Sequence, residues 1–320
     1  MIQFLMIFLN KLFQDLFDRS KNITLNCKSI NKCAPCLKLE IYKMTSEQRY
    51  ILTEKIIEKH QISVIVFAGS HQNDPSPLLK AARVTNKALI NIANNPIIYY
   101  VLDAINKSKL VKSIYLVGLN HQDLQVTIDK QIYFLPGNAM RFDNLISTLN
   151  HLNSFEFPPE HILIMPSDIP LITAEIIDQC ILLMNIPETN KDGYVGIISK
   201  NVMENSFPNA NKRYSRLKEG EYCGSDINAI RVRAILSNEI LFRNLLENRK
   251  SRVRMILRVY PIFILRYIMG RLSINHIINL FKKKFDVDIT HYLNPFAEAG
   301  MDLDYPEQLE RFENLVKRQS

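Results

Sequence analysis

Short apolar runs alternate with amphipathic stretches along most of this chain. The runs are rich in β-branched residues and end at glycine, proline or polar residues, which is typical of buried strands in a parallel sheet. Five such strands are predicted, at 64–68, 114–118, 132–135, 162–165 and 194–198, and further extended segments at 226–232 and 287–290. Helical spacing of apolar residues predicts helices that begin near residues 96, 142, 174, 238 and 306. The polar stretch 201–220 is predicted to be rich in loops. This alternation predicts an α/β fold whose sheet is mainly parallel, with helices on both faces.

The first 60 residues do not share this pattern, and we expect an N-terminal extension there, helical or poorly ordered, before a catalytic domain at 61–320. The apolar stretch from Met1 to Phe17 is interrupted by charged residues, is too short to span a bilayer, and lacks a basic start and a cleavage site. We interpret it as an amphipathic helix, unless translation begins at Met44.

Composition narrows the class of protein only in part. Hydrophobic residues make up 47% of the 320, enough for a large core, and the net charge is +8. This charge suits an anionic small molecule, an acidic membrane or nucleic acid. Five cysteines include the pair Cys33 and Cys36, but no second pair or histidine pair completes a zinc site. The odd count and the lack of a signal peptide predict a cytoplasmic protein.

The basic, apolar stretch at 249–285 differs from the rest, since it has no strand period. It predicts two helices with breaks near residues 260–261 and 270–273. We favour a packed helical hairpin whose arginine side chains extend to water. The alternatives are that this segment binds an anionic substrate or makes peripheral contact with an acidic membrane. Nucleic acid is not an expected partner because no known binding motif accompanies the charge.

Residues that could bind phosphate groups come after the first predicted strand. Gly69 and Ser70 leave room for a ligand to approach the backbone, and Lys87 lies after the loop, where it could neutralise a triphosphate. Neither GxxxxGK[ST] nor GxGxxG occurs, which argues against a P-loop NTPase and a dinucleotide-dependent dehydrogenase.

Carboxylates far apart in the chain supply a candidate magnesium site. Asp168 directly follows a buried strand and is flanked by prolines, while Asp302 and Asp304 alternate with Leu303 in an extended segment. Magnesium is usually held by one or two carboxylates together with substrate phosphates. We therefore predict Mg²⁺ at Asp168, Asp302 and Asp304. The alternative is that these are ordinary turn and edge aspartates.

Several segments, in order, resemble one family: IVFAGS, VTNKALINIANNPIIYYVLDAI, LPGNAMRFDNLISTL, ILIMPSDIPLIT, YCGSDINAIRV and GMDLDYPEQLERF. Over about residues 62–316 the chain resembles the molybdenum-cofactor-guanylyltransferase-like (MobA-like) NTP transferases. The resemblance implies a Rossmann-like, GT-A-type fold and in-line attack by an acceptor phosphate or hydroxyl on the α-phosphorus of an NTP, with release of pyrophosphate.

The resemblance also implies roles for individual residues. Lys87 and Asp168 would be catalytic, and Asp168 with Asp302 or Asp304 would hold Mg²⁺. Residues near the nucleotide or acceptor would be Ala68, Gly69, Ser70, Arg83, Gly137, Asn138, Asn144 and Asn228. The chain departs from the family at Ser70, where glycine is usual, and at Asp74, where many members have arginine.

We therefore predict a Mg²⁺-dependent nucleotidyltransferase that acts on an NTP and a small phosphorylated or hydroxyl acceptor. One alternative is a glycosyltransferase of the same fold that uses a nucleotide-sugar, since the Asp302–Asp304 pair fits either. Another is a catalytically silent nucleotide sensor, favoured by the loop departures. The sequence sets neither the base, nor the acceptor, nor the oligomeric state.

Overall fold

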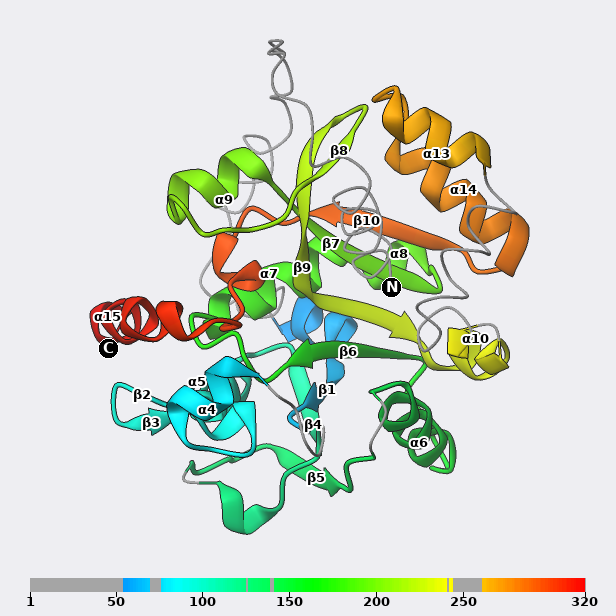
Figure 1. Ribbon diagram of the computed structural model, residues 1–320. Coiled ribbons are helices and arrows are strands. Elements are labelled where there is room, and N and C mark those ends of the chain that lie inside the picture. Colours follow the sequence, from blue (N-terminus) through cyan, green and yellow to red (C-terminus); the bar gives the residue numbers. More distant parts are fainter. Residues whose placement is uncertain are drawn as a thin grey trace, which may run out of the picture.

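A computed structural model describes residues 54–69, 76–124, 126–138, 141–240, 242–243 and 261–319 (Figure 1). The main sheet has eight strands. They are β1 (Ile62–Phe67), β4 (Val111–Val117), β5 (Gln131–Leu135), β6 (His161–Pro166), β7 (Gly193–Ser199), β8 (Ser215–Leu217), β9 (Gly220–Arg231) and β10 (Ile289–Leu293). A separate two-residue ladder joins β2 (Asn91–Ile92) to β3 (Asn95–Pro96).

The sheet is mixed but mainly parallel, as predicted. Its order is β10-β7-β9-β6-β1-β4-β5, with β8 paired to β9. Strands β5, β4, β1 and β6 run parallel to one another, and β7 runs parallel to β10. Only β9 on this path runs antiparallel to the strands beside it. The C-terminal ends of the other path strands therefore meet at one edge of the sheet, where α/β folds bind ligands.

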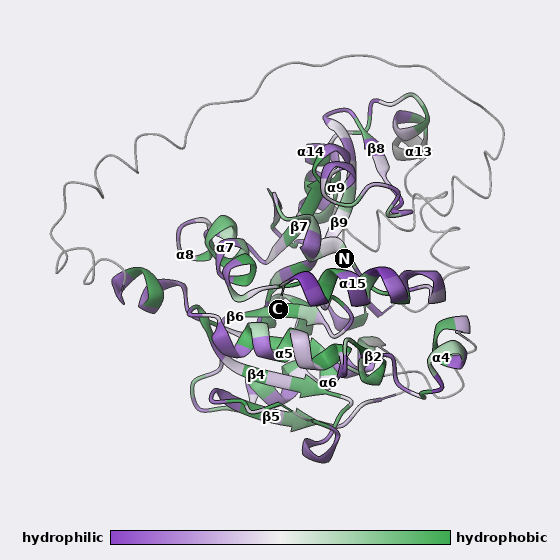
Figure 2. Cartoon of the chain, turned by 90° about the vertical axis from the view of Figure 1, so that its left-hand side faces the viewer, coloured by the Kyte–Doolittle hydropathy of each residue, from purple (hydrophilic) through white to green (hydrophobic). Residues whose placement is uncertain are grey.

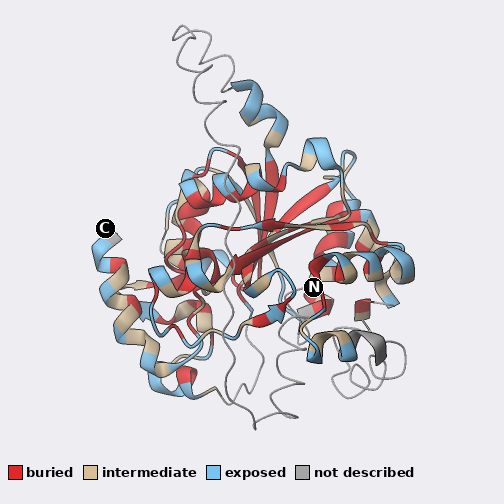
Figure 3. Ribbon diagram, turned by 90° about the horizontal axis from the view of Figure 1, so that it is seen from above, coloured by how far each residue is buried: buried red, intermediate tan, exposed pale blue. Residues whose placement is uncertain are grey.

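Alternate residues of each central strand enter different cores. Val64 and Val66 pack with α5 (Ile97–Lys107) and α7 (Ala174–Met184) on one face, whereas Ile65 packs with α6 (Arg141–Asn153) on the other. This period of two follows from the pleat of the strand. The central strands are buried and the outer helix faces are exposed in Figure 3, while Figure 2 shows hydrophobic colour concentrated on the sheet.

The remaining helices complete the two layers. On the face of α6 lie α10 (Val232–Leu236) and α14 (Ile274–Phe285), with α13 (Pro261–Ile268) beside α14. A third core joins α4 (Pro77–Ala82), α9 (Lys200–Ser206) and α15 (Leu309–Gln319). Short helical turns are α8 (Ile186–Thr189), η1 (Lys87–Leu89), η2 (His121–Asp123), η3 (Ala297–Gly300) and η4 (Pro306–Gln308). None of the helices in the described part of the chain combines the length and hydrophobicity needed to cross a bilayer.

Several local predictions were wrong. The segment 201–220, predicted as loop, contains most of α9 and all of β8, and β9 begins six residues before the predicted strand at 226. The loop after β1 contains α4, and the strand predicted at 287–290 is β10, two residues later. The predicted break at 270–273 is confirmed between α13 and α14. The predicted N-terminal extension is described only at 54–60, which is helical. Cys33, Cys36, half of the helix predicted at 238–247, and residues 249–260 lie outside the described residues.

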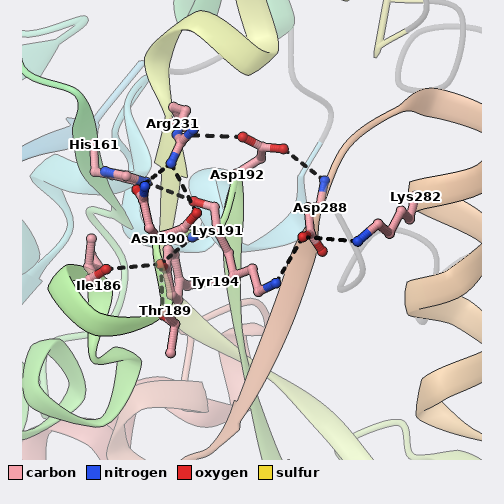
Figure 4. Close-up of polar contacts among 10 residues, drawn as sticks. All are labelled: His161, Ile186, Thr189, Asn190, Lys191, Asp192, Tyr194, Arg231, Lys282 and Asp288. Atoms are coloured by element: carbon pink, nitrogen blue, oxygen red, sulfur yellow. Dashed lines mark hydrogen bonds and ion pairs between the residues drawn. The ribbon is translucent and has the colours of Figure 1, made fainter.

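A polar network ties the strands together at the edge opposite their C-terminal ends (Figure 4). The ring of His161 contacts the carbonyl of Lys191 at 2.7 Å, and the guanidinium of Arg231 lies 3.5 Å from Asp192. The ammonium of Lys191 lies 2.8 Å from Asp288, which joins the starts of β7 and β10. These contacts stabilise the end of the sheet that lies away from the candidate site.

Candidate functional site

The neighbouring residue Asn86 fixes the position of Lys87. The buried Asn86 side chain donates a 2.8 Å hydrogen bond to the carbonyl of Ala68, directly after β1, and accepts one of 2.9 Å from the amide of Ala88. Asn86 thereby caps η1, whose first residue is Lys87, and attaches it to the end of β1. Lys87 is held at the C-terminal edge of the sheet although it lies 19 positions after Ala68 in the sequence.

Asp168 reaches the same edge from β6, which ends two residues before it. The backbone at Ser167 continues the pairing with β1, since its amide donates to the carbonyl of Phe67 at 3.2 Å. The amide of Leu303 then donates to the carbonyl of Asp168 at 3.0 Å. This bond brings the 302–304 segment beside the end of β6, with Leu303 fully buried and the aspartates on either side of it available.

The ammonium of Lys87 bridges two carboxylates. It donates to Asp168 and to Asp304, each at 2.6 Å. The side chains are 27% exposed for Lys87, 17% for Asp168 and 50% for Asp304, so the bridge lies in a partly desolvated site that opens to solvent on the Asp304 side. The structure therefore brings together the lysine and the carboxylates that the sequence analysis selected from three separate segments.

Lys212 is a second cation of this site, and the sequence analysis did not select it. It forms an ion pair with Asp302 and is only 16% exposed. The sequence showed a basic pair at 212–213 in a segment interpreted as loop. Only the return of β8 and β9 toward the end of β6 brings it to the carboxylates, so burial was the missing signal.

The charges in this cluster are mutually dependent. Burial lowers the pKa of Lys87, but Asp168 and Asp304 outweigh that effect and raise it above its usual value. Lys212 behaves in the same way beside Asp302 and Asp226. Burial and the charge of Asp302 raise the pKa of Asp304. Both lysines are therefore fully charged at neutral pH.

The carboxylates form a donor set suited to a divalent cation. One oxygen each from Asp168, Asp302 and Asp304 lies within 4.8 Å of the others. Ligand oxygens around Mg²⁺ stand about 3–4 Å apart, and Mg²⁺ prefers carboxylate oxygens. These three carboxylates with Lys87 and Lys212 leave a net charge of −1, which would repel a triphosphate unless a cation offset it. The residues present fit magnesium.

The backbone segments that follow β1, β4 and β5 pack closely against one another. Gly118, after β4, has φ +95°, and a side chain there would meet the Cα atom of Gly69 at 2.5 Å. A Cβ atom at Gly137 would meet the Cα atom of Gly118 at 3.0 Å. Asn144, on α6, accepts a short hydrogen bond from the amide of Asn138. Four residues predicted near the nucleotide thus lie together beside β1, β4 and β5, with Gly118 added to them.

The other predicted site residues lie at varied positions. Ala68 is buried directly after β1, and Ser70 and Asp74 lie outside the described residues. Arg83 ends α4 in the left-handed conformation, with an exposed side chain that forms no ion pair with any described residue. The Asn228 side chain accepts from the amide of Gly196 at 3.1 Å and donates to the carbonyl of Ser225 at 3.0 Å, so it supports the irregular pairing of β7 with β9.

Comparison with known proteins identifies the fold and the family of this chain. The fold is that of the Rossmann-like nucleotidyltransferases. A cytidylyltransferase family model matches residues 79–243, more than half of the chain, and the chain belongs to that family. The resemblance seen in the sequence thus identified the class of enzyme, a nucleotidyltransferase, but its MobA-like branch is not the family matched. No curated protein matches the chain.

Two solved structures illustrate the fold. A hypothetical transferase from Thermus thermophilus is 24% identical, with a TM-score of 0.65 over 78% of this chain and 99% of that one. A CMP:2-keto-3-deoxy-manno-octonic acid synthetase complexed with CTP is 15% identical, with a TM-score of 0.51 over 81% of this chain and 100% of that one. At these identities the two structures support the shared fold.

Proposed function

We propose that this chain is a Mg²⁺-dependent cytidylyltransferase that transfers CMP from CTP to a small anionic acceptor. The observation that carries the proposal is the bridge from Lys87 to Asp168 and Asp304, with Asp302 beside them. A lysine among carboxylates at the C-terminal edge of an α/β sheet suits the binding of a nucleoside triphosphate with its metal. The family and the CTP-bound structural neighbour favour cytosine over the guanine implied by the MobA-like resemblance.

Each part of the site has a proposed task. Asp168, Asp302 and Asp304 would hold Mg²⁺, which when bound offsets the charge of the phosphates. Lys87 would neutralise the charge that builds on the phosphates during displacement. The close-packed glycines at 69, 118 and 137 would let the nucleotide approach the backbone, next to Asn138 and Asn144. Ala68, Ser70, Arg83 and Asn228 remain predicted contacts of the nucleotide or acceptor.

The reaction is an in-line substitution. An oxygen of the acceptor forms a bond to the α-phosphorus of CTP, the bond from that phosphorus to the bridging oxygen of the β-phosphate breaks, and pyrophosphate leaves. An acceptor phosphate attacks as its anion, so no proton needs to be removed. A hydroxyl acceptor would have to lose its proton to a base.

The position of Lys212 favours an acceptor that carries negative charge. It contacts Asp302, whereas Lys87 contacts Asp168 and Asp304, so the two ammonium groups pair with different members of the carboxylate cluster. Lys87 is attached to β1, while Lys212 lies on the segment that leads into β8 and β9. We assign Lys212 to the phosphate or carboxylate group of the acceptor, where a buried cation has the greatest electrostatic effect.

The test is release of pyrophosphate by the purified full chain. CTP, ATP, GTP and UTP are each incubated with Mg²⁺ and a panel of sugar phosphates and alditol phosphates. Release with CTP, dependent on one acceptor and abolished by a chelator, is the expected result. CTP binding in calorimetry without turnover on any acceptor would favour the nucleotide sensor instead. Turnover of a nucleotide-sugar in preference to CTP would favour the glycosyltransferase.

A further inference from the structure

Helices α13 and α14 form a hairpin at one corner of the molecule, beside β8 (Figure 1). The hairpin is attached to the turn between β8 and β9. The amide of Lys218 donates to the carbonyl of Leu272 at 2.8 Å, and Glu219 accepts from the amide of Ile274 at 3.2 Å. Leu272 and Ile277 are buried against the sheet, so the inner face of the hairpin is packed.

The outer side of this hairpin is apolar where it faces solvent. Leu265, Ile268 and Met269 are 55%, 53% and 46% exposed. Their spacing of three and four residues places them on one side of the helix. Tyr267 packs against the core on another side. A contiguous exposed apolar stripe of this kind marks a surface that binds an apolar partner.

The sequence segment that contains this stripe carries charge of one sign only. Residues 249–285 contain ten lysines and arginines and no acidic residue, whereas the rest of the chain has 30 basic and 32 acidic residues. The entire positive net charge therefore lies in this one segment. Among its described residues, Arg271 is exposed next to the stripe, Arg266 is half-buried within it, and Lys282 and Lys283 are exposed on α14.

We propose that the outer face of the hairpin, defined by Leu265, Ile268, Met269, Arg266 and Arg271, binds the surface of an acidic lipid bilayer. Apolar side chains enter the boundary between headgroups and acyl chains while neighbouring cations contact anionic headgroups, which is how interfacial helices bind. The outer face would lie on the membrane and not cross it. Nucleic acid would satisfy the cations but leave the apolar stripe in water.

The proposal is independent of the enzyme's chemistry. Strand β9 leads from the hairpin toward the carboxylates, and the six steps from Gly220 to Asp226 span about 20 Å at the rise of an extended strand. Binding at this corner would therefore leave the candidate active site open to water. Turnover of a water-soluble acceptor should not change when vesicles are added.

Co-sedimentation of the full chain with vesicles tests the proposal. One set contains about 30% phosphatidylserine in phosphatidylcholine and the other phosphatidylcholine alone, at about 0.1 M NaCl. We expect binding to the acidic vesicles that exceeds binding to the neutral ones at least about tenfold and decreases with added salt. Replacing all three stripe residues (Leu265→Ser, Ile268→Ser, Met269→Ser) should lower the bound fraction at least about fivefold.

A second variant, Arg266→Gln with Arg271→Gln, tests the charge separately and should weaken binding to acidic vesicles only. The matched control is Phe157→Ser with Leu183→Ser, because these residues are 85% and 44% exposed outside the hairpin. The control should bind like the unchanged chain. Lack of binding to acidic vesicles, or equal binding by both hairpin variants and the unchanged chain, would overturn the proposal. So would tighter binding to single-stranded RNA than to the acidic vesicles.

Discussion

The backbone amide of Leu303 donates a 3.0 Å hydrogen bond to the carbonyl of Asp168. This contact joins the end of β6 to a segment near the C-terminus and leaves Asp302 and Asp304 on either side of a fully buried residue. Because a backbone bond sets the spacing, the carboxylates stay together when their side-chain partners change. The end of β6 and the 302–304 segment therefore set the position of the carboxylates, while Lys87 comes from η1 and Lys212 from the segment before β8.

Asn86 is expected to be a positioning residue for Lys87. Asn86→Ala removes its hydrogen bonds with the carbonyl of Ala68 and the amide of Ala88. Leaving buried polar groups unsatisfied should lower the free energy of unfolding by about 1–3 kcal/mol. Urea unfolding measures this loss, and kcat should decrease because the lysine loses its anchor. Unchanged stability and unchanged kcat would show that η1 is held by other contacts.

Gly118 is expected to tolerate no side chain. Gly118→Ala would place a Cβ atom 2.5 Å from the Cα atom of Gly69 in a left-handed backbone, and should destabilise the fold by more than about 3 kcal/mol. Gly270→Ala is the matched control, because Gly270 also has positive φ but nothing lies within 4 Å of the added atom. It should lose only about 1 kcal/mol. Equal losses in urea unfolding would mean that the close approach of the strand ends is not what requires Gly118.

Substitution of Lys212 should weaken use of the acceptor more than binding of the nucleotide. Lys212→Met removes the cation paired with Asp302, so we expect kcat/KM for the acceptor to decrease about 100-fold while calorimetric affinity for CTP changes less than about threefold. Lys107→Met is the control, because Lys107 pairs with Asp103 on the surface of α5. A loss of CTP affinity with an unchanged acceptor KM would instead place Lys212 on the nucleotide.

His161 should make stability depend on pH. Burial and nearby Arg231 lower its pKa, although its contact with the Lys191 carbonyl opposes this. The unfolded chain therefore takes up a proton first, so stability is complete above about pH 6.5 and decreases toward the folded pKa, at no more than about 1.4 kcal/mol per pH unit. His161→Gln should reduce this slope in urea unfolding between pH 7.5 and 5.5. The half-buried His291, whose pKa is also lowered by burial, would account for the remaining pH dependence.

The sequence predicted what local pattern controls. Strands such as β1 and β6 are buried on both faces and therefore appear as continuous apolar runs. The helix predicted to begin near residue 174 is α7, capped by Thr173, whose side chain accepts a hydrogen bond from the amide of Ile176. Asp168 could be selected because it directly follows such a run. Lys87 could be selected because a lysine after a phosphate-sized loop has a clear electrostatic use.

The features that the sequence did not predict depend on contacts between segments far apart in the chain. β8 and most of the first half of β9 are polar, and they are strands because they pair with each other and with β7. Lys212 resembles any surface lysine until that pairing buries it beside Asp302. The structural use of Asn228, which supports the pairing at Gly196, was likewise not visible from its neighbours in sequence.

The most direct test of the proposed function uses radiolabelled CTP. The full chain is incubated with labelled CTP, Mg²⁺ and the acceptor found in the panel, and the product that carries the label is identified. With label on the α-phosphorus, radioactivity should appear in the acceptor product, and with label on the γ-phosphorus it should leave as pyrophosphate. Lys87→Met and Asp168→Asn should each slow both transfers at least about 100-fold, while both variants remain folded. Transfer of the γ-label to the acceptor, or full activity in either variant, would contradict CMP transfer at the Lys87–Asp168 site.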